Sequence, residues 1–234
     1  MPDIKNRIKI ARSFGLASKS YDVSARLQRY SGKHLMPWLP NRNDLTVLDL
    51  GAGTGFFTHI LAGSYQQVIG VDISHQMVEF AKAHRSTEIS WLRADAFKLP
   101  LQTASIDFIY SNLVIQWCEP LDKVLDEILR VLKPGGRLLV LEFSKPEVPG
   151  LAPVYDFYSF NILPKIGKIV ADDEDSYRYL AESIRMHPDQ ETLKGMMENV
   201  GFENTFYQIK YSIFEKKSQS RSTSQDLSND VLSK

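Results

Sequence analysis

Short apolar runs alternate with amphipathic segments along the middle of the chain. The runs are rich in Val, Ile, Leu and Phe and are bounded by glycine and polar residues, which is typical of strands buried on both faces of a parallel sheet. Strands that alternate with amphipathic helices form βαβ units, so the pattern predicts an α/β fold with a doubly wound, mainly parallel, Rossmann-like sheet and helices on both faces. The expected strands are residues 46–50, 67–72, 89–95, 106–112 and 137–143.

Three helices are expected between these strands. Residues 56–62 follow the first strand, and Ser74 is a good N-cap for a helix after the second strand. Residues 121–132 carry their apolar side chains on one helical face, and the breaker residues 133–136 are expected to end that helix. Such helices supply the crossovers that parallel strands need.

The pattern changes outside this core, so the chain divides into five expected parts. An N-terminal helical segment covers the site, and a helical cap insertion rich in aromatic, proline and charged residues lies over the carboxyl edge of the sheet. A last helix and a last strand, the latter near residues 206–214, complete the core, and a polar tail is expected to be disordered. The parts are residues 1–40 (N-terminal cover), 41–144 (α/β core), 145–187 (cap insertion), 188–215 (last helix and strand) and 216–234 (tail).

Composition narrows the class of protein. Hydrophobic residues make up 43% of the chain, which can support a sizeable core, and 28 basic residues balance 28 acidic ones. A net charge of zero argues against a broad nucleic-acid footprint. The single Cys118 excludes an internal disulfide and fits a reducing compartment. The basic start lacks the apolar run of a signal peptide and no stretch is long enough to cross a bilayer, so we expect a cytoplasmic protein.

A glycine-rich turn follows the first expected strand. It reads Val47-Leu-Asp-Leu-Gly-Ala-Gly-Thr-Gly55, and its glycines let the backbone turn tightly and approach a ligand without Cβ clashes. The spacing G-x-G-x-G differs from the dinucleotide fingerprint G-x-G-x-x-G. With an acidic residue ahead of the first glycine, it resembles the class I methyltransferases that use S-adenosylmethionine (SAM). Taken alone, the turn could also be purely structural.

Polar residues end three further strands. Asp72 ends the second strand, where a carboxylate can accept hydrogen bonds from both ribose hydroxyls. Helix capping is the alternative for Asp72, but Ser74 already fills that role. The resemblance implies that Asp95 lies near the adenine amino group and that Ser111 and Asn112 lie beneath the sulfonium. We therefore expect SAM as cofactor. The expected cofactor-binding residues are Asp49, Gly51, Gly53, Thr54, Gly55, Asp72, Ile73, Asp95, Ala96, Ser111 and Asn112.

Two longer resemblances divide the chain within this superfamily. Residues 8–134 resemble the malonyl-acyl-carrier-protein O-methyltransferase of biotin biosynthesis, most specifically in Ser111-Asn-Leu-Val-Ile-Gln-Trp-Cys118. Residues 131–203 resemble, more closely, the C-methyltransferase of ubiquinone and menaquinone biosynthesis, as in Ser176-Tyr-Arg-Tyr-Leu-Ala-Glu-Ser-Ile-Arg-Met-His-Pro-Asp-Gln190. Both resemblances imply the same fold and cofactor, and they differ in the methyl acceptor.

The acceptor depends mainly on the elements that cover the sheet edge, residues 1–30 and 145–187. The quinone family has a Gly-Leu-Arg-Asn element after its fourth strand, whereas this chain has Leu113-Val-Ile-Gln-Trp117. Because the cap resembles the quinone enzyme, we expect C-methylation of a polyprenyl benzoquinol or demethylmenaquinol. O-methylation of the free carboxyl of malonyl-acyl-carrier protein is the alternative.

Polar and aromatic residues of the cover and the cap are the acceptor candidates. A quinol ring carbon becomes nucleophilic when the neighbouring phenol loses or shares its proton, so groups that stabilise a phenolate are expected. The candidate catalytic residues are Tyr177, Arg185 and His187, and the expected substrate contacts are Tyr21, Gln116, Trp117, Tyr155, Tyr158 and Arg178. Packing within the cap, and a helix-capping role for His187, are the structural alternatives. An arginine here would serve a malonyl carboxylate equally well.

Other function classes are less consistent with these motifs. A nucleotide-binding oxidoreductase is disfavoured by the glycine spacing, whereas a non-catalytic nucleotide-binding scaffold stays open. The sequence contains no zinc-ligand cluster, Ser-His-Asp pattern or phosphate-binding P-loop. The expected partners are a small-molecule or lipid-quinol substrate, or acyl-carrier protein under the alternative, and no nucleic acid. A lipid acceptor is compatible with transient contact at a membrane surface.

Overall fold

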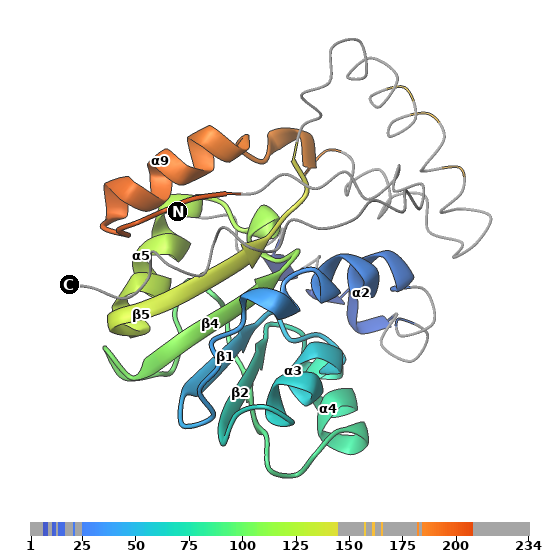
Figure 1. Ribbon diagram of the computed structural model, residues 1–234. Coiled ribbons are helices and arrows are strands. Elements are labelled where there is room, and N and C mark those ends of the chain that lie inside the picture. The colour runs from blue at the N-terminus through green and yellow to red at the C-terminus, as the bar shows by residue number, and fades with distance from the viewer. Residues whose placement is uncertain are drawn as a thin grey trace, which may run out of the picture.

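The computed structural model describes residues 25–144 and 184–207 and, outside these ranges, residues 7–8, 11–12, 14–16, 21, 157, 161, 165 and 182. Within them, five parallel strands form one sheet in the order β3-β2-β1-β4-β5 (Figure 1). The predicted doubly wound parallel α/β fold is confirmed. The strands are β1 (Thr46–Leu50), β2 (Gln67–Asp72), β3 (Ser90–Arg93), β4 (Ile106–Asn112) and β5 (Leu132–Leu141).

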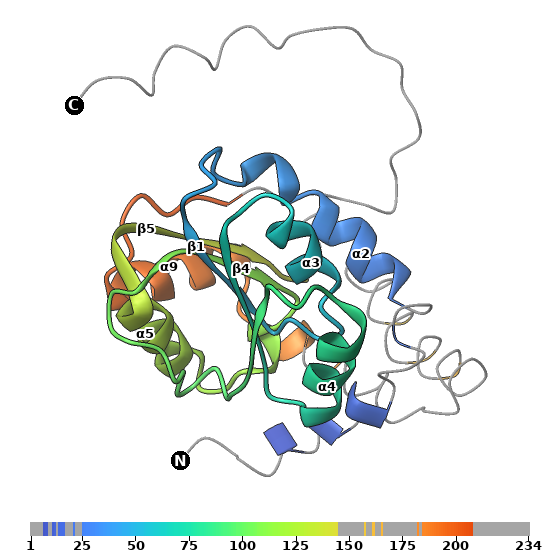
Figure 2. The same cartoon turned by 90° about the horizontal axis from the view of Figure 1, so that it is seen from below.

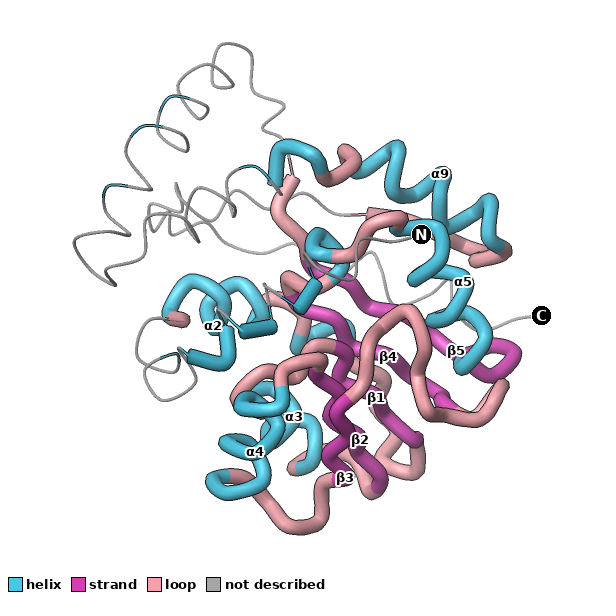
Figure 3. Tube along the Cα trace, turned by 180° about the vertical axis from the view of Figure 1, so that it is seen from behind, coloured by secondary structure: helices cyan, strands magenta, loops and turns pink. Residues whose placement is uncertain are grey.

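Helices cover both faces of the sheet. Figure 2 shows α5 and α9 on one side and α2, α3 and α4 on the other, and Figure 3 shows the same layers from behind. The α-helices are α2 (Arg26–Lys33), α3 (Phe56–Ala62), α4 (His75–His84), α5 (Leu121–Val131) and α9 (Gln190–Val200), and the short 3-10 helices are η1 (Met36–Trp38) and η2 (Ile115–Trp117).

The central strand β1 is buried on both faces. Val47 packs in the core beneath α3, whereas Leu48 and Leu50 pack in the core beneath α5. All three side chains are almost fully buried. Because successive residues of a strand point to opposite faces, burial on both sides requires apolar residues at successive positions, and Asp49 is the one charged residue in β1.

The winding of the chain creates a crevice at the carboxyl edge of the sheet. The chain starts at the central β1, runs outward through β2 to β3, and returns to β4 on the other side of β1. The connections that leave β1 and β4 therefore diverge to opposite sides. Ligands of open α/β sheets bind at such a switch point.

The fifth strand differs from the expectation. Helix α5 ends at Val131 and β5 begins at Leu132, so the breaker residues 133–136 lie inside the strand and do not form a separate turn. Leu132 pairs with Ile106, and the register with β4 then shifts before pairing resumes. Residues 133–136 of β5 therefore lie opposite the single residue Asp107 of β4, and the left-handed backbone of Gly135, at φ +74°, accommodates this irregularity.

Other expected boundaries are met or fall outside the described residues. Ser74 caps α4 and α9 ends at Gly201, as predicted. The third strand is shorter than expected, because only residues 90–93 pair with β2. Most of the cap and of the expected strand 206–214, and the whole tail, lie outside the described residues.

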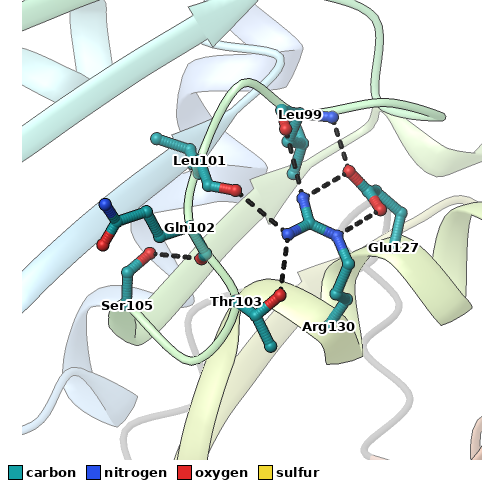
Figure 4. Close-up of polar contacts among 7 residues, drawn as sticks. All are labelled: Leu99, Leu101, Gln102, Thr103, Ser105, Glu127 and Arg130. Carbon is teal, nitrogen blue, oxygen red and sulfur yellow. Dashed lines mark hydrogen bonds and ion pairs between the residues drawn. The ribbon is translucent and has the colours of Figure 1, made fainter.

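The connection between β3 and β4 is held by one arginine (Figure 4). Arg130 of α5 forms a two-bond ion pair with Glu127, with both N–O distances at 2.7 Å. Its guanidinium also donates to the carbonyls of Leu99 and Leu101 at 3.1 and 3.0 Å and to the hydroxyl of Thr103. Glu127 in turn accepts from the amide of Leu99 at 2.6 Å. The irregular connection is thus fixed to α5.

We predict that Arg130→Met lowers the free energy of unfolding by about 1–2 kcal/mol. The loss should fall below the full value of several charged hydrogen bonds because the arginine is one-third exposed. The hydrogen bond from Arg130 lowers the pKa of Glu127, so its stabilising effect is present above the ordinary pKa of a glutamate and is lost as the pH falls. Urea unfolding should therefore show a smaller difference between wild type and variant at acid pH.

Lys82→Met is the matched control for this prediction. Lys82 also pairs with a glutamate three residues away, Glu79, but that pair is exposed and touches no loop carbonyl. Its removal should leave stability almost unchanged. Equal losses in the two variants would contradict the role assigned to Arg130.

Candidate functional site

A pocket lies at the carboxyl edge of the sheet. Its walls come from the ends of four strands, the first turn of α3, and the N-terminal cover. The lining residues from the core are Asp49, Leu50, Gly51, Ala52, Gly53, Thr54, Phe56, Phe57, Val71, Asp72, Ile73, Ser74, Met77, Ala94, Asp95, Ala96, Tyr110, Asn112, Leu113, Val114, Trp117 and Cys118, and those from the cover are Arg7, Ala11, Phe14, Tyr21, Ala25, Gln28 and Arg29. The pocket therefore occupies the switch point of the sheet.

The glycine turn forms the floor of this pocket. Gly51, Gly53 and Gly55 have φ angles of +71°, +55° and +74°, a region that disfavours residues with a Cβ. A Cβ on Gly51 would also lie 2.2 Å from the side chain of Val114. The amides of Gly51 and Ala52 donate to the carbonyl of Val71 at 2.8 and 2.9 Å. The turn is thus tied to β2 and packed against the segment after β4.

Asp72 joins the glycine turn to helix α4. One carboxylate oxygen accepts from the amide of Gly53 at 2.9 Å, and the other accepts from the amide of Ser74 at 2.8 Å. Burial raises the pKa of Asp72, and these two hydrogen bonds oppose that rise. Ser74 caps α4 with its own hydroxyl, as expected, so Asp72 is not needed for that role. The carboxylate borders the pocket with lone pairs left for a ligand.

Asp49 is more deeply buried at the end of β1. Its side chain accepts a 2.5 Å hydrogen bond from the hydroxyl of Thr58. Burial, reinforced by the nearby charge of Asp72, raises the pKa of Asp49 to about 7. A carboxyl group with this pKa changes charge near neutral pH, so a cation arriving in the pocket would favour its ionised form.

Asp95 lies at the adjoining end of β3 and meets the N-terminal cover. It forms an ion pair with Arg7 and accepts from the amide of Phe97 at 3.1 Å. The guanidinium of Arg7 also lies over the ring of Phe97, 4.1 Å from its centroid. Arg7 was not singled out from the sequence, because only tertiary packing brings it to the pocket.

The end of β4 separates two residues that were expected to act together. Asn112 lines the pocket and donates to the carbonyl of Gln28 at 3.4 Å. Ser111 is fully buried and does not line the pocket. Gly55 is also absent from the lining and lies instead against the ring of Trp91. Both residues support the pocket from behind.

The segment after β4 forms an aromatic wall with the cover. Trp117 makes an edge contact with Phe14 at 5.6 Å between centroids, and Phe14 makes another with Tyr21 at 6.0 Å. Tyr21 and Trp117 both line the pocket, and each contacts the ring of Phe14. Gln116 does not line it, because its side chain is buried and turns back toward the carbonyl of Leu113.

Glu142, at the end of β5, fixes this wall. One carboxylate oxygen accepts from the amides of Val114 and Ile115, both at 2.7 Å. Burial raises the pKa of Glu142 to about 8, and that of the pocket thiol Cys118 to about 12. The thiol therefore stays protonated at neutral pH and is a poor nucleophile.

The cap candidates are not part of the described pocket. Arg185 is exposed and His187 is buried, and neither lines the pocket. Tyr155, Tyr158, Tyr177 and Arg178 lie outside the described residues. Among the residues that are described, no group of three His, Cys, Asp or Glu side chains is placed to hold a metal ion. In that same part of the chain, no helix is long and apolar enough to span a membrane.

Solved structures share this fold at low sequence identity. A SAM-dependent methyltransferase from Thermotoga maritima superposes with a TM-score of 0.59 at 23% identity, over 81% of this chain and 80% of that one. A SAM-dependent methyltransferase from Aquifex aeolicus gives a TM-score of 0.56 at 21% identity, over 80% and 87%. At such identities the likeness establishes the fold alone.

Sequence relatives are closer. The ubiquinone/menaquinone biosynthesis C-methyltransferase UbiE of Vibrio vulnificus (strain YJ016) is 43% identical over 212 residues, which cover 85% of this chain and 82% of the relative. The model of the ubiE/COQ5 methyltransferase family matches residues 8–213. This match includes the segment that resembled the biotin-pathway enzyme, and none of these findings supports that resemblance. The chain belongs to the ubiE/COQ5 family of SAM-dependent methyltransferases.

Proposed function

We propose that this chain transfers the methyl group of SAM to a ring carbon of a polyprenyl benzoquinol or demethylmenaquinol in ubiquinone and menaquinone biosynthesis. Sequence identity of 43–44% over 85% of the chain to ubiquinone/menaquinone biosynthesis C-methyltransferases supports the reaction. The observation that carries the proposal is that one pocket has both a carboxylate wall and an aromatic wall. Three carboxylates at or just beyond strand ends, Asp49, Asp72 and Asp95, line the same pocket as the aromatic wall that includes Phe14 and Trp117.

The carboxylate side of the pocket fits the adenosine of the cofactor. Asp72 has two oxygens held by backbone amides, and each can accept a further hydrogen bond from a ribose hydroxyl. Asp95 and Ala96 border the same side, and we assign them to the adenine. The open space beside Gly53, where a Cβ would meet no atom, leaves room for the ligand to approach the backbone.

Gly51, Thr54 and Ile73 complete the assigned cofactor wall, and Gly55 and Ser111 act only as its support. When bound, SAM supplies a methyl group that already carries its leaving group. The chain therefore has to align donor and acceptor and exclude water, and the reaction needs no covalent bond to the protein. Phe57 and the neighbouring apolar residues keep the space above β1 dry.

The aromatic side of the pocket fits the acceptor. The rings of Phe14, Tyr21 and Trp117 meet edge to face and can pack against a flat quinol ring. We assign Tyr21 and Trp117 to the acceptor and leave Gln116 as a support of the wall. Tyr177, Arg185 and His187 remain sequence predictions for phenolate stabilisation, because the described pocket includes none of them.

We assign the protein to the cytoplasm. The single thiol, Cys118, fits a reducing compartment. A lipid acceptor would then reach the pocket from a membrane surface, which is compatible with a transient contact there. Acyl-carrier protein is not needed as a partner for this reaction.

We predict that Asp72→Ala weakens binding of S-adenosylhomocysteine at least tenfold, because charge-assisted hydrogen bonds of about 1.5–3 kcal/mol are lost. Calorimetric titration should show a second effect. Wild type should bind the 2′-deoxy analogue more weakly than the parent compound, whereas the variant should bind both alike. Unchanged affinity in a folded variant, judged by its melting temperature, would reject the ribose assignment.

We predict that the purified protein methylates a ring carbon of a demethylated quinol and leaves malonyl-loaded acyl-carrier protein unmodified. Both acceptors should be offered in one tube with SAM carrying a labelled methyl group, and the products separated by mass. Selectivity should favour the quinol because an aromatic wall suits a ring better than a carboxylate. Detection of a methyl ester on the malonyl group, without any methylated quinol, would refute the proposal.

We predict that Trp117→Ala lowers turnover of the quinol roughly tenfold or more, because the ring that positions the acceptor is lost. The affinity of this variant for S-adenosylhomocysteine should stay within about twofold of the wild-type value. Trp38→Ala is the control, since that ring is exposed and outside the pocket, and both values should be unchanged. If Trp117→Ala also weakened binding of S-adenosylhomocysteine about tenfold, Trp117 would belong to the cofactor half of the pocket.

A further inference from the structure

Two arginines line the described pocket, and they lie on different parts of its wall. Arg7 forms an ion pair with Asp95 at the end of β3. Arg29 belongs to α2, and its guanidinium lies over the ring of Phe56, 4.2 Å from the centroid. Phe56 is the first residue of α3 and directly follows the glycine turn. The second cation therefore lies beside the turn that forms the pocket floor.

Helix α2 is fixed in this position by contacts with β4 and α3. The hydroxyl of Tyr110 donates to the carbonyl of Gly32 at 3.2 Å, and Asn112 donates to the carbonyl of Gln28 at 3.4 Å. A Cβ on Gly32 would lie 2.3 Å from the ring of Phe57, so the backbone of α2 approaches α3 closely. Figure 1 shows α2 beside α3 at this edge. Arg29 is thus carried by a helix that is anchored to the end of β4.

The sheet order decides which part of the cofactor would reach Arg29. Asp72 ends β2 and Asp95 follows the end of β3, on one side of the central β1, whereas Tyr110 and Asn112, which anchor α2, belong to β4 on the other side. With adenosine assigned to β2 and β3, the amino-acid end of the cofactor extends across β1 toward β4. That end carries a carboxylate. A carboxylate that leaves water for a protein pocket needs a cation or several hydrogen bonds.

We infer that Arg29 binds the carboxylate of the methionine part of SAM and so selects ligands that carry an intact amino-acid end. The inference rests on the proposed function. The ring of Phe56 stabilises the guanidinium plane and limits its rotation, which favours a planar, two-bond contact with a carboxylate. Arg7 lies on the other side of β1, where it pairs with Asp95 beyond the end of β3, so its position does not match the amino-acid end of the cofactor.

The experiment compares two ligands that differ by the carboxylate alone, SAM and its decarboxylated form. Calorimetric titration of wild type should show a preference for SAM. Arg29→Gln should weaken SAM binding at least tenfold and leave binding of decarboxylated SAM within about twofold, so that the preference disappears. Arg29→Lys keeps the charge but not the planar fork, and should retain part of the preference.

Arg42→Gln is the matched control, because that arginine is exposed, pairs with Asp44, and lies outside the pocket. It should bind both ligands as wild type does. If Arg29→Gln and Arg29→Lys each lost as much affinity for decarboxylated SAM as for SAM, Arg29 would only support the fold. That result would overturn the inference. Unchanged affinity for both, with a raised KM for the quinol, would assign Arg29 to the acceptor and also overturn it.

The same titrations separate this inference from the proposed function. A wild-type protein that binds neither ligand would contradict the cofactor assignment itself. A wild-type protein that binds SAM and its decarboxylated form equally well would refute only the role of Arg29. Binding with the expected preference, but without methylation of a quinol, would leave the role of Arg29 supported and reject the acceptor.

Discussion

The site depends on one partly buried carboxylate that joins two backbone segments. Asp72 accepts from the amide of Gly53 in the turn after β1 and from the amide of Ser74 at the start of α4. Burial alone would favour the neutral acid, and the two amides stabilise the charged form against that tendency. The turn and the helix start are therefore held in place before any ligand arrives. Such preorganisation reduces the ordering that binding would otherwise require.

Three carboxylates at one sheet edge would repel one another without separate partners. Asp49 has the hydroxyl of Thr58, Asp72 has backbone amides, and Asp95 has the cation of Arg7. Desolvation still raises the pKa values of the first two, so part of the folding free energy is given up to keep them at this edge. A cofactor with a sulfonium and an ammonium group would offset that repulsion on binding. The electrostatics are thus better matched to the loaded site than to the empty one.

The sequence was sufficient for the parts of the fold that depend on local pattern. Buried parallel strands show as apolar runs, and a glycine turn with positive φ has a recognisable spacing, so β1 to β4 and the glycine turn after β1 were predicted. Neighbouring residues of a strand face opposite ways, which is why Asn112 lines the pocket while Ser111 does not. Arg7 and Arg29 were missed because their segments reach the site only through tertiary packing. The irregular start of β5 was missed because glycine and proline are typical both of a turn and of an irregular stretch within a strand.

The proposed acceptor half of the pocket is assembled differently from the proposed cofactor half. Asp49, Asp72 and Asp95 are carried by adjacent strands of the sheet, whereas the aromatic wall combines the N-terminal cover with the segment after β4. That segment is the one that departs from the Gly-Leu-Arg-Asn element of the quinone family. It is held by Glu142 from the end of β5 and by the contact between Val114 and Gly51. Changes in the wall can therefore alter the acceptor while the strand ends keep the cofactor, which explains how one fold accommodates different methyl acceptors.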